Sequence, residues 1–306
     1  MGFIDGIIPP YYESILITVG IYIIMALGLN LITGVTGQLN LGHAAYMCIG
    51  AYTSAMITLK LGLPFFVAIL SGGALAAVFG FVIGYPTLRL TGDYLAICTL
   101  GFGEILKSVL LNIPAVGGAM GIAGIPPKTT LTITLIIVII VIISMVRVEN
   151  SRFGRALVAI RENEIAAECN GVNATKYKLQ MFSFGCFIAG IGGALWAHKI
   201  MVLQPRDFGF LRSIEILNMV VLGGLGSIPG TILGAAVLTS IPEILRFSSE
   251  YRMILYGALL VTMMVFRPHG LMGGVSFNTL AKRSVGWLKP RNKTDDKPPG
   301  QKGTGG

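Results

Sequence analysis

Long apolar runs constrain this chain more than any other feature of its sequence. A bilayer core is crossed by a helix of about 20 predominantly apolar residues. Nine runs approach that length, and the seventh is the shortest: residues 14–33, 43–59, 65–85, 94–111, 131–146, 177–197, 214–225, 228–245 and 253–266. We therefore predict an all-α, polytopic integral membrane protein with about 8–10 transmembrane helices.

The composition excludes a soluble globule. Hydrophobic residues make up 54% of the chain, charged residues only 12%, and the mean hydropathy is +0.77, whereas ordinary soluble domains carry about 25% charged residues. The net charge of +9 arises from Lys and Arg in loops and in the tail after Ala281. Because this pattern is typical of cytoplasmic loops beside anionic lipid, we expect membrane lipid and no nucleic acid as a partner.

The distribution of charge predicts a topology. We assign residues 1–281 to one transmembrane domain, with a cytoplasmic loop at about 147–176, and residues 282–306 to a disordered, basic cytoplasmic tail. Five runs precede that loop and four follow it, which places the N-terminus outside.

The cytoplasmic loop contains the longest polar interruption, residues 151–173. Ser151 can cap a helix that follows it, and Asn163 can cap a second one beginning at Glu164. Gly171 stands where a residue in the left-handed conformation would end that second helix. We predict two short helices on the membrane surface.

Two glycine-rich stretches, residues 28–52 and 222–236, interrupt the apolar pattern. Paired interruptions of this kind indicate broken or re-entrant segments that line a transport pathway, because unwound backbone is tolerated at membrane depth only beside protein or water. The alternative is close helix packing through small residues. Both interpretations remain open at this point.

Several polar residues inside or beside the apolar runs are candidates for the pathway. Glu104 and Lys107 share a helix face by their i, i+3 spacing, and intramembrane ions are functional candidates; a mutually neutralising pair is the alternative. The uncharged candidates lie at run ends or breaks: Asn30, Gln38, Asn40 and Asn218. Arg212 and Glu215 are expected at the outer surface.

No pattern in the chain indicates catalysis. The sequence lacks a GxxxxGK[ST] phosphate-binding loop, so ATP hydrolysis would need separate subunits. Its three histidines are far apart, its four cysteines form no CxxC pair, and His43 is expected to pack at a helix end. We therefore expect no catalytic, cofactor or metal site and no enzyme activity.

Four motifs, in order, resemble the permeases of branched-chain amino acid ABC importers. The polar loop, within GRALVAIRENEIAAECNGVNATKYKLQMF, resembles their Glu-Ala-Ala-x-x-x-Gly loop, although Ile165 separates Glu164 from the alanines. In a second motif, GQLNLGHAAYMCIGAYTSA, Asn40 stands where serine is usual. The others, in a likeness that extends from about Gly28 to Gly273, are GDYLAICTLGFGEILKSVLLN, typical of the LivM-type permease, and VVLGGLGSIPGTILGA with MMVFRPHGLMG.

The resemblance implies a permease subunit that carries leucine, isoleucine and valine across a bacterial plasma (inner) membrane. Its implied partners are a second, LivH-like permease, two LivG/LivF-like ATPases that hold ATP and Mg, and a periplasmic or lipid-anchored binding protein. Ala166 and Ala167 would let the loop sit deep in a groove on an ATPase. The implied coupling residues are Arg155, Arg161, Glu164, Ala166, Ala167 and Gly171.

Three other functions compete with this one. Urea or short amides could be the cargo of the same kind of importer. An ion-coupled secondary carrier would need coupling carboxylates at the midplane and no docking loop. A membrane anchor without transport is disfavoured, because it has no use for two broken segments.

Overall fold

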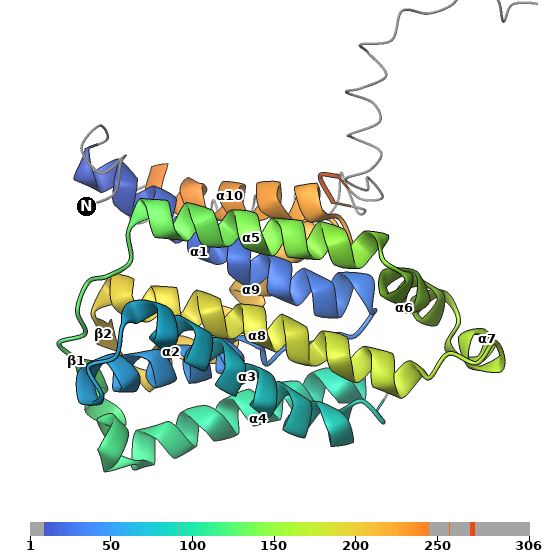
Figure 1. The fold of residues 1–306 in the computed structure, drawn as a ribbon, viewed down its shortest axis with the longest axis horizontal. Helices are drawn as coiled ribbons and strands as arrows, with labels where there is room; N and C mark the ends of the chain where they lie inside the picture. The colour runs from blue at the N-terminus through green and yellow to red at the C-terminus, as the bar shows by residue number, and fades with distance from the viewer. Residues whose placement is uncertain (1–8, 91, 245–256, 258–269, 273–306) are drawn as a thin grey trace, which may run out of the picture.

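The computed structural model describes residues 9–90, 92–244, 257 and 270–272. Within these residues eight helices lie side by side as a bundle (Figure 1). They are α1 (Pro10–Asn30), α2 (His43–Lys60), α3 (Phe65–Thr87), α4 (Asp93–Asn112), α5 (Leu131–Asn150), α8 (Ala174–Ile200), α9 (Phe210–Gly223) and α10 (Ile228–Ile244). The predicted all-α membrane fold is confirmed.

The two ends of the bundle differ. One end, which we call the loop end, carries the short helices α6 (Arg152–Glu162) and α7 (Glu164–Cys169). The opposite end, the far end, carries the start of α1 and a pair of short antiparallel strands, β1 (Ile122–Ala123) and β2 (Val202–Leu203) (Figure 1). Helix α1 therefore begins at the end opposite α6 and α7, as an odd number of passes before the loop requires.

The predicted runs correspond closely to helices. Five segments are long and apolar enough to cross a membrane: Pro10–Val35, Phe65–Thr87, Asp93–Asn112, Leu131–Asn150 and Ala174–Ile200. The helix α10 is apolar but shorter, and α9 has only 14 residues. The predicted run 253–266 lies outside the described residues apart from Gly257, and the predicted tail lies outside them altogether.

Helix α8 is central, because it packs against α1, α2 and α3. Small residues bring these helices together: a Cβ on Gly50 of α2 would overlap the backbone of Gly190 of α8. A Cβ on Gly28 of α1 would come within 3.0 Å of the carbonyl oxygen of Gly185. Close packing through glycine, one of the two predicted roles, is therefore present.

The same glycine-rich stretches also interrupt helices. The first break follows α1: it consists of a π-helical turn, η1 (Leu31–Val35), and the non-helical residues 36–42 before α2. The second break lies between α9 and α10, where Gly224 and Gly226 have φ angles of +107° and +81°. Since side chains rarely adopt such angles, glycine is required there. The glycine-rich stretches therefore both pack helices closely and interrupt them; that the interruptions line a transport pathway stays a prediction.

Candidate functional site

The loop end is built as the sequence predicts. Ser151 Oγ accepts a hydrogen bond from Gly154 N at 3.1 Å and caps α6. Asn163 Oδ1 accepts one from Ala166 N at 3.0 Å and caps α7. Gly171 follows α7 with a φ of +81°. The two caps and the left-handed glycine fix both helix starts and the turn into α8.

The surface of α7 differs from the expectation. Ala167 is 5% exposed and packs against Ile160 and Ala174 of its own chain. Its small side chain therefore fits an internal contact, and the prediction that it faces a groove on a partner is wrong. Ala166 is exposed, and Ile165 is 77% exposed. The large apolar side chain that α7 exposes is Ile165, which interrupts the sequence motif.

Two polar contacts hold α6 and α7 to the bundle. Glu164 forms an ion pair with Lys178 of α8, with an Nζ–Oε1 distance of 2.6 Å. Arg155 Nη1 donates to the carbonyl oxygen of Asn150, the last residue of α5, at 3.1 Å. Glu164 and Arg155, two of the predicted coupling residues, therefore make contacts within this chain that join the surface helices to α8 and α5.

Arg161 makes a longer-range contact. From the last turn of α6 its Nη1 donates to the carbonyl oxygen of Gly34, in η1, at 2.5 Å. Asn30 Oδ1 accepts a hydrogen bond from Gly226 N, in the second break, at 2.8 Å. A Cβ on Gly34 would collide with both Asn30 Oδ1 and Gly226 N. We call Asn30, Gly34, Arg161 and Gly226 the break junction, because they join α6 to both breaks.

Other predicted polar residues surround the first break. Asn40 Oδ1 accepts a hydrogen bond from Gly42 N at 2.9 Å, just before α2. Gln38 is 5% exposed, and neither atom of its side-chain amide has a partner among the described residues. It lines a pocket of about 230 Å³ at the loop end, together with Asp93, Arg161 and Lys178. The first break therefore borders a cavity beside α6.

Glu104 and Lys107 form the predicted pair in α4, since Lys107 Nζ donates to Glu104 Oε2. Glu104 Oε1 also accepts a hydrogen bond from Phe210 N, at the start of α9, at 3.2 Å. The pair lines a pocket of about 330 Å³ between α4 and the chain around the start of α9. Six charged residues line this charged pocket: Glu104, Lys107, Arg206, Asp207, Arg212 and Glu215.

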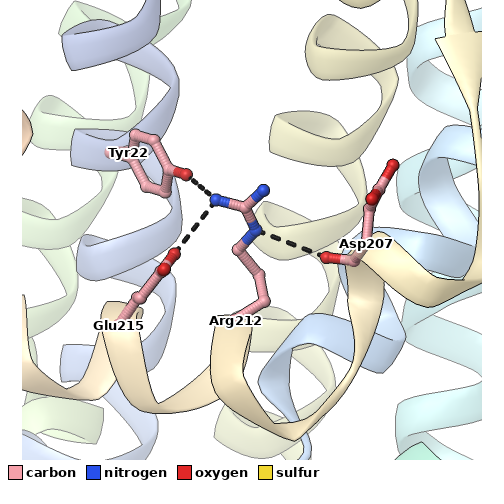
Figure 2. A network of polar contacts seen from close by, with 4 residues as sticks. All are labelled: Tyr22, Asp207, Arg212 and Glu215. Carbon is pink, nitrogen blue, oxygen red and sulfur yellow. Dashed lines mark hydrogen bonds and ion pairs between the residues drawn. The ribbon is translucent and has the colours of Figure 1, made fainter. Parts of the chain in front are cut away.

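Arg212 connects this pocket to the bundle core (Figure 2). Its Nη1 donates to Tyr22 Oη in α1 and to Glu215 Oε2, the latter at 3.0 Å. Its Nε donates to the Asp207 carbonyl oxygen at 3.4 Å. The guanidinium carbon lies 5.2 Å from the ring centre of Trp196 in α8. The Arg212 side chain is therefore held among α1, α8 and α9, whereas that of Glu215 is 47% exposed; the expected place of both at the outer surface stays a prediction.

The remaining candidates lie apart from both pockets. Asn218 is half-buried in α9 and lines neither pocket. His43 is buried at the start of α2, with Nε2 3.1 Å from the Met25 carbonyl oxygen, which confirms its packing role. Across the described part of the chain, no three His, Cys, Asp or Glu side chains come close enough to hold a metal ion.

Comparison with known proteins identifies similar chains. The family model described as the permease component of the branched-chain amino acid transport system matches residues 11–264. The chain is 37% identical, over 82% of its length and 68% of the relative, to the high-affinity branched-chain amino acid transport system permease protein LivM of Salmonella typhimurium.

Two more distant relatives carry similar names. Identity is 26% to LivH of the same organism, over 82% of this chain and 91% of that protein. It is 26% to BraD of Pseudomonas aeruginosa, over 84% of this chain and 93% of that protein. Both are named high-affinity branched-chain amino acid transport system permease proteins, so the likeness to LivM is the greater of the three.

Proposed function

Because this chain belongs to the permease family of branched-chain amino acid transport systems, we propose that it carries leucine, isoleucine and valine across a bacterial inner membrane as part of an ATP-driven importer. It is a multi-pass membrane permease and not an enzyme. Its proposed partners are a LivH-like permease, two LivG/LivF-like ATPases that bind ATP and Mg, and a periplasmic or lipid-anchored binding protein.

The break junction supports this proposal. An ATPase bound to Ile165 on α7 would move α6, because α6 and α7 pack against one another. Arg161 would pass that displacement to Gly34, and the contact between Gly34 and Gly226 would pass it to the second break. Helices α1, α9 and α10 all end or begin at these breaks. A surface movement thereby reaches the helix interruptions through direct contacts.

Uptake by the assembled transporter in lipid vesicles tests the proposal. Replacing Ile165 with Asp places a charge where α7 would enter an apolar groove, so ATP-driven leucine uptake should fall at least tenfold. The matched control is Glu168→Gln, a polar change on the same exposed helix. Leucine uptake at the wild-type rate in Ile165→Asp would exclude α7 as the docking element.

Arg161 gives a second, separate test of the coupling route. Arg161→Met removes the donor to Gly34 while keeping an apolar stem, so ATP hydrolysis should continue with little leucine uptake. Arg161→Lys should restore part of the uptake, because a shorter cation can still reach a carbonyl group. Equal uptake in the wild type and Arg161→Met would remove the junction from the coupling route.

The wild-type complex also tests the competing functions. ATP-dependent uptake of urea or a short amide, without leucine uptake, would identify the alternative cargo. Leucine uptake driven by an ion gradient in the absence of ATP would indicate a secondary carrier.

A further inference from the structure

The charged pocket lies within the span of the bundle. Glu104 precedes Asn112, the last residue of α4, by eight residues, which corresponds to about 12 Å along a helix axis. Arg212 lies over Trp196, one helical turn before α8 ends at Ile200. The pocket is therefore below the far end of the bundle, at a depth where lipid tails would otherwise contact α4.

Charged groups at this depth cannot face hydrocarbon without a large penalty. Helix α4 nevertheless leaves this face open, since only 17% of its spanning window is buried in the chain. The side chain of Glu104 is 38% exposed and that of Lys107 26% exposed. This face of α4 must therefore border water or another protein in the membrane.

The charges in the pocket balance. Three are positive and three are negative, and two ion pairs, Lys107–Glu104 and Arg212–Glu215, use part of their hydrogen-bonding capacity. The hydrogen bonds of Arg212 use Nε and Nη1. In Figure 2 its second terminal nitrogen points away from both Tyr22 and Glu215. A guanidinium edge is thus left for an additional acceptor.

An apolar hollow adjoins the charged pocket. Its apolar walls are Ile105 and Val109 of α4 and Ile113, the residue that follows α4. Ser108 and Asn112 also line it, and Glu104 lines both cavities. Ile105 is 63% exposed, so its side chain is available for contact. A charged compartment and an apolar one therefore meet at a single carboxylate.

We propose that these two compartments form this chain's half of the substrate site, built for the zwitterionic head and the aliphatic side chain of an amino acid. The substrate carboxylate binds Arg212 and Lys107, the ammonium group binds Glu104 and Glu215, and the side chain lies in the apolar hollow. The second permease subunit covers the open face of α4. This inference rests on the proposed function and names the site that performs it.

The first test measures leucine uptake by the assembled complex with saturating binding protein. Arg212→Gln removes the carboxylate donor, so uptake should fall more than tenfold, whereas Arg212→Lys should retain a measurable fraction. The control Lys128→Gln removes a positive charge from an exposed position outside the pocket and should not alter uptake. Wild-type uptake in an assembled Arg212→Gln complex would overturn the inference.

The second test does not depend on the stability of Arg212 variants. Leu211, at the rim of the pocket, is 78% exposed. In a Cys169→Ser background, which removes the exposed native thiol, Leu211→Cys should react with a membrane-impermeant maleimide. Leucine with binding protein and ATP should slow that labelling severalfold, and glutamate should not. Equal labelling rates with and without leucine would overturn the assignment.

The two tests separate this inference from the proposed function. A wild-type complex without leucine uptake would contradict the function itself. A wild-type complex that takes up leucine, with Arg212→Gln equally active, would contradict only the site. Loss of uptake in Arg212→Gln together with leucine-protected labelling of Leu211→Cys supports both.

Discussion

Helices α4 and α5 are alike in length and exposure but differ in chemistry. Each has 20 residues, and within the described part of the chain only 17% of the most apolar stretch of α4 and 33% of that of α5 are buried. Before Arg147, its first charged residue, the exposed residues of α5 are isoleucines and one leucine. Helix α4 carries Glu104 and Lys107 in its interior.

The difference shows that exposure alone does not identify a lipid-facing helix. The mean hydropathy of the most apolar stretch is 2.8 in α5 and 1.6 in α4. Lipid tails are as apolar as these side chains, so α5 needs no protein partner to cover its exposed face in a bilayer. A charged pair is costly in lipid. These properties suit the exposed face of α5 to lipid and that of α4 to protein or water.

The largest expected effect comes from placing a charge on each helix in turn. Ile140 of α5 and Ile105 of α4 are 54% and 63% exposed. Ile140→Lys should reduce the yield of inserted protein severely, because Lys at the centre of a spanning helix costs roughly 3 kcal/mol. Ile105→Lys should insert normally and lose leucine uptake. Membrane-fraction yield and vesicle uptake measure the two effects.

One result would contradict the assignment of the α4 face. If Ile105→Lys lowers insertion as much as Ile140→Lys does, α4 faces lipid. A conservative pair, Ile140→Leu and Ile105→Leu, controls for changes in shape.

A smaller effect is expected from the ion pair. A double-mutant cycle with Glu104→Gln, Lys107→Met and the double variant should give a coupling energy of about 1 kcal/mol or less in the isolated chain, because both side chains are partly exposed. In the assembled complex, where a second permease would exclude water, the coupling should increase. Thermal unfolding of both preparations measures it, and additive losses in both would show that the pair is not covered.

The smallest effect concerns the shape of the two surfaces. Val109→Ala removes two methyl groups from the apolar hollow. Full burial at about 0.8 kcal/mol per carbon would weaken leucine transport about 15-fold, and because Val109 is 46% exposed we expect only a severalfold loss. Ile139→Ala on α5, 54% exposed, should leave uptake unchanged because lipid replaces the lost contact. Concentration-dependent uptake distinguishes them, and equal effects at both positions would remove the contrast between the helices.

Local chemistry explains what the sequence predicts well. Helices α2, α3 and α5 begin at His43, Phe65 and Leu131, where the apolar runs begin. The caps at Ser151 and Asn163 involve neighbours three residues away. Such features depend on a few adjacent residues, so composition and spacing reveal them.

Contacts between distant segments could not be predicted in the same way. The hydrogen bond from Arg161 to Gly34 joins residues 127 positions apart in the sequence, and that from Gly226 to Asn30 joins residues 196 positions apart. A helix that is apolar on every side carries no periodic signal of which face is buried, so neither the junction nor the charged pocket is visible in the sequence. Ile165 shows the same limit, because the sequence motif treats it as an insertion although it is the large apolar side chain that α7 exposes.

The π-helical turn η1 changes the number of residues per turn where α1 ends, at the loop end of the bundle. Thr36 N donates to the carbonyl oxygen of Leu31, five residues back, at 3.3 Å. A π turn therefore holds one residue more than an α turn would. Conversion of η1 to α geometry would release that residue to the connection before α2, and one residue corresponds to about 100° of helical rotation. The bundle thus stores a spare length of chain at the point where Arg161 is attached.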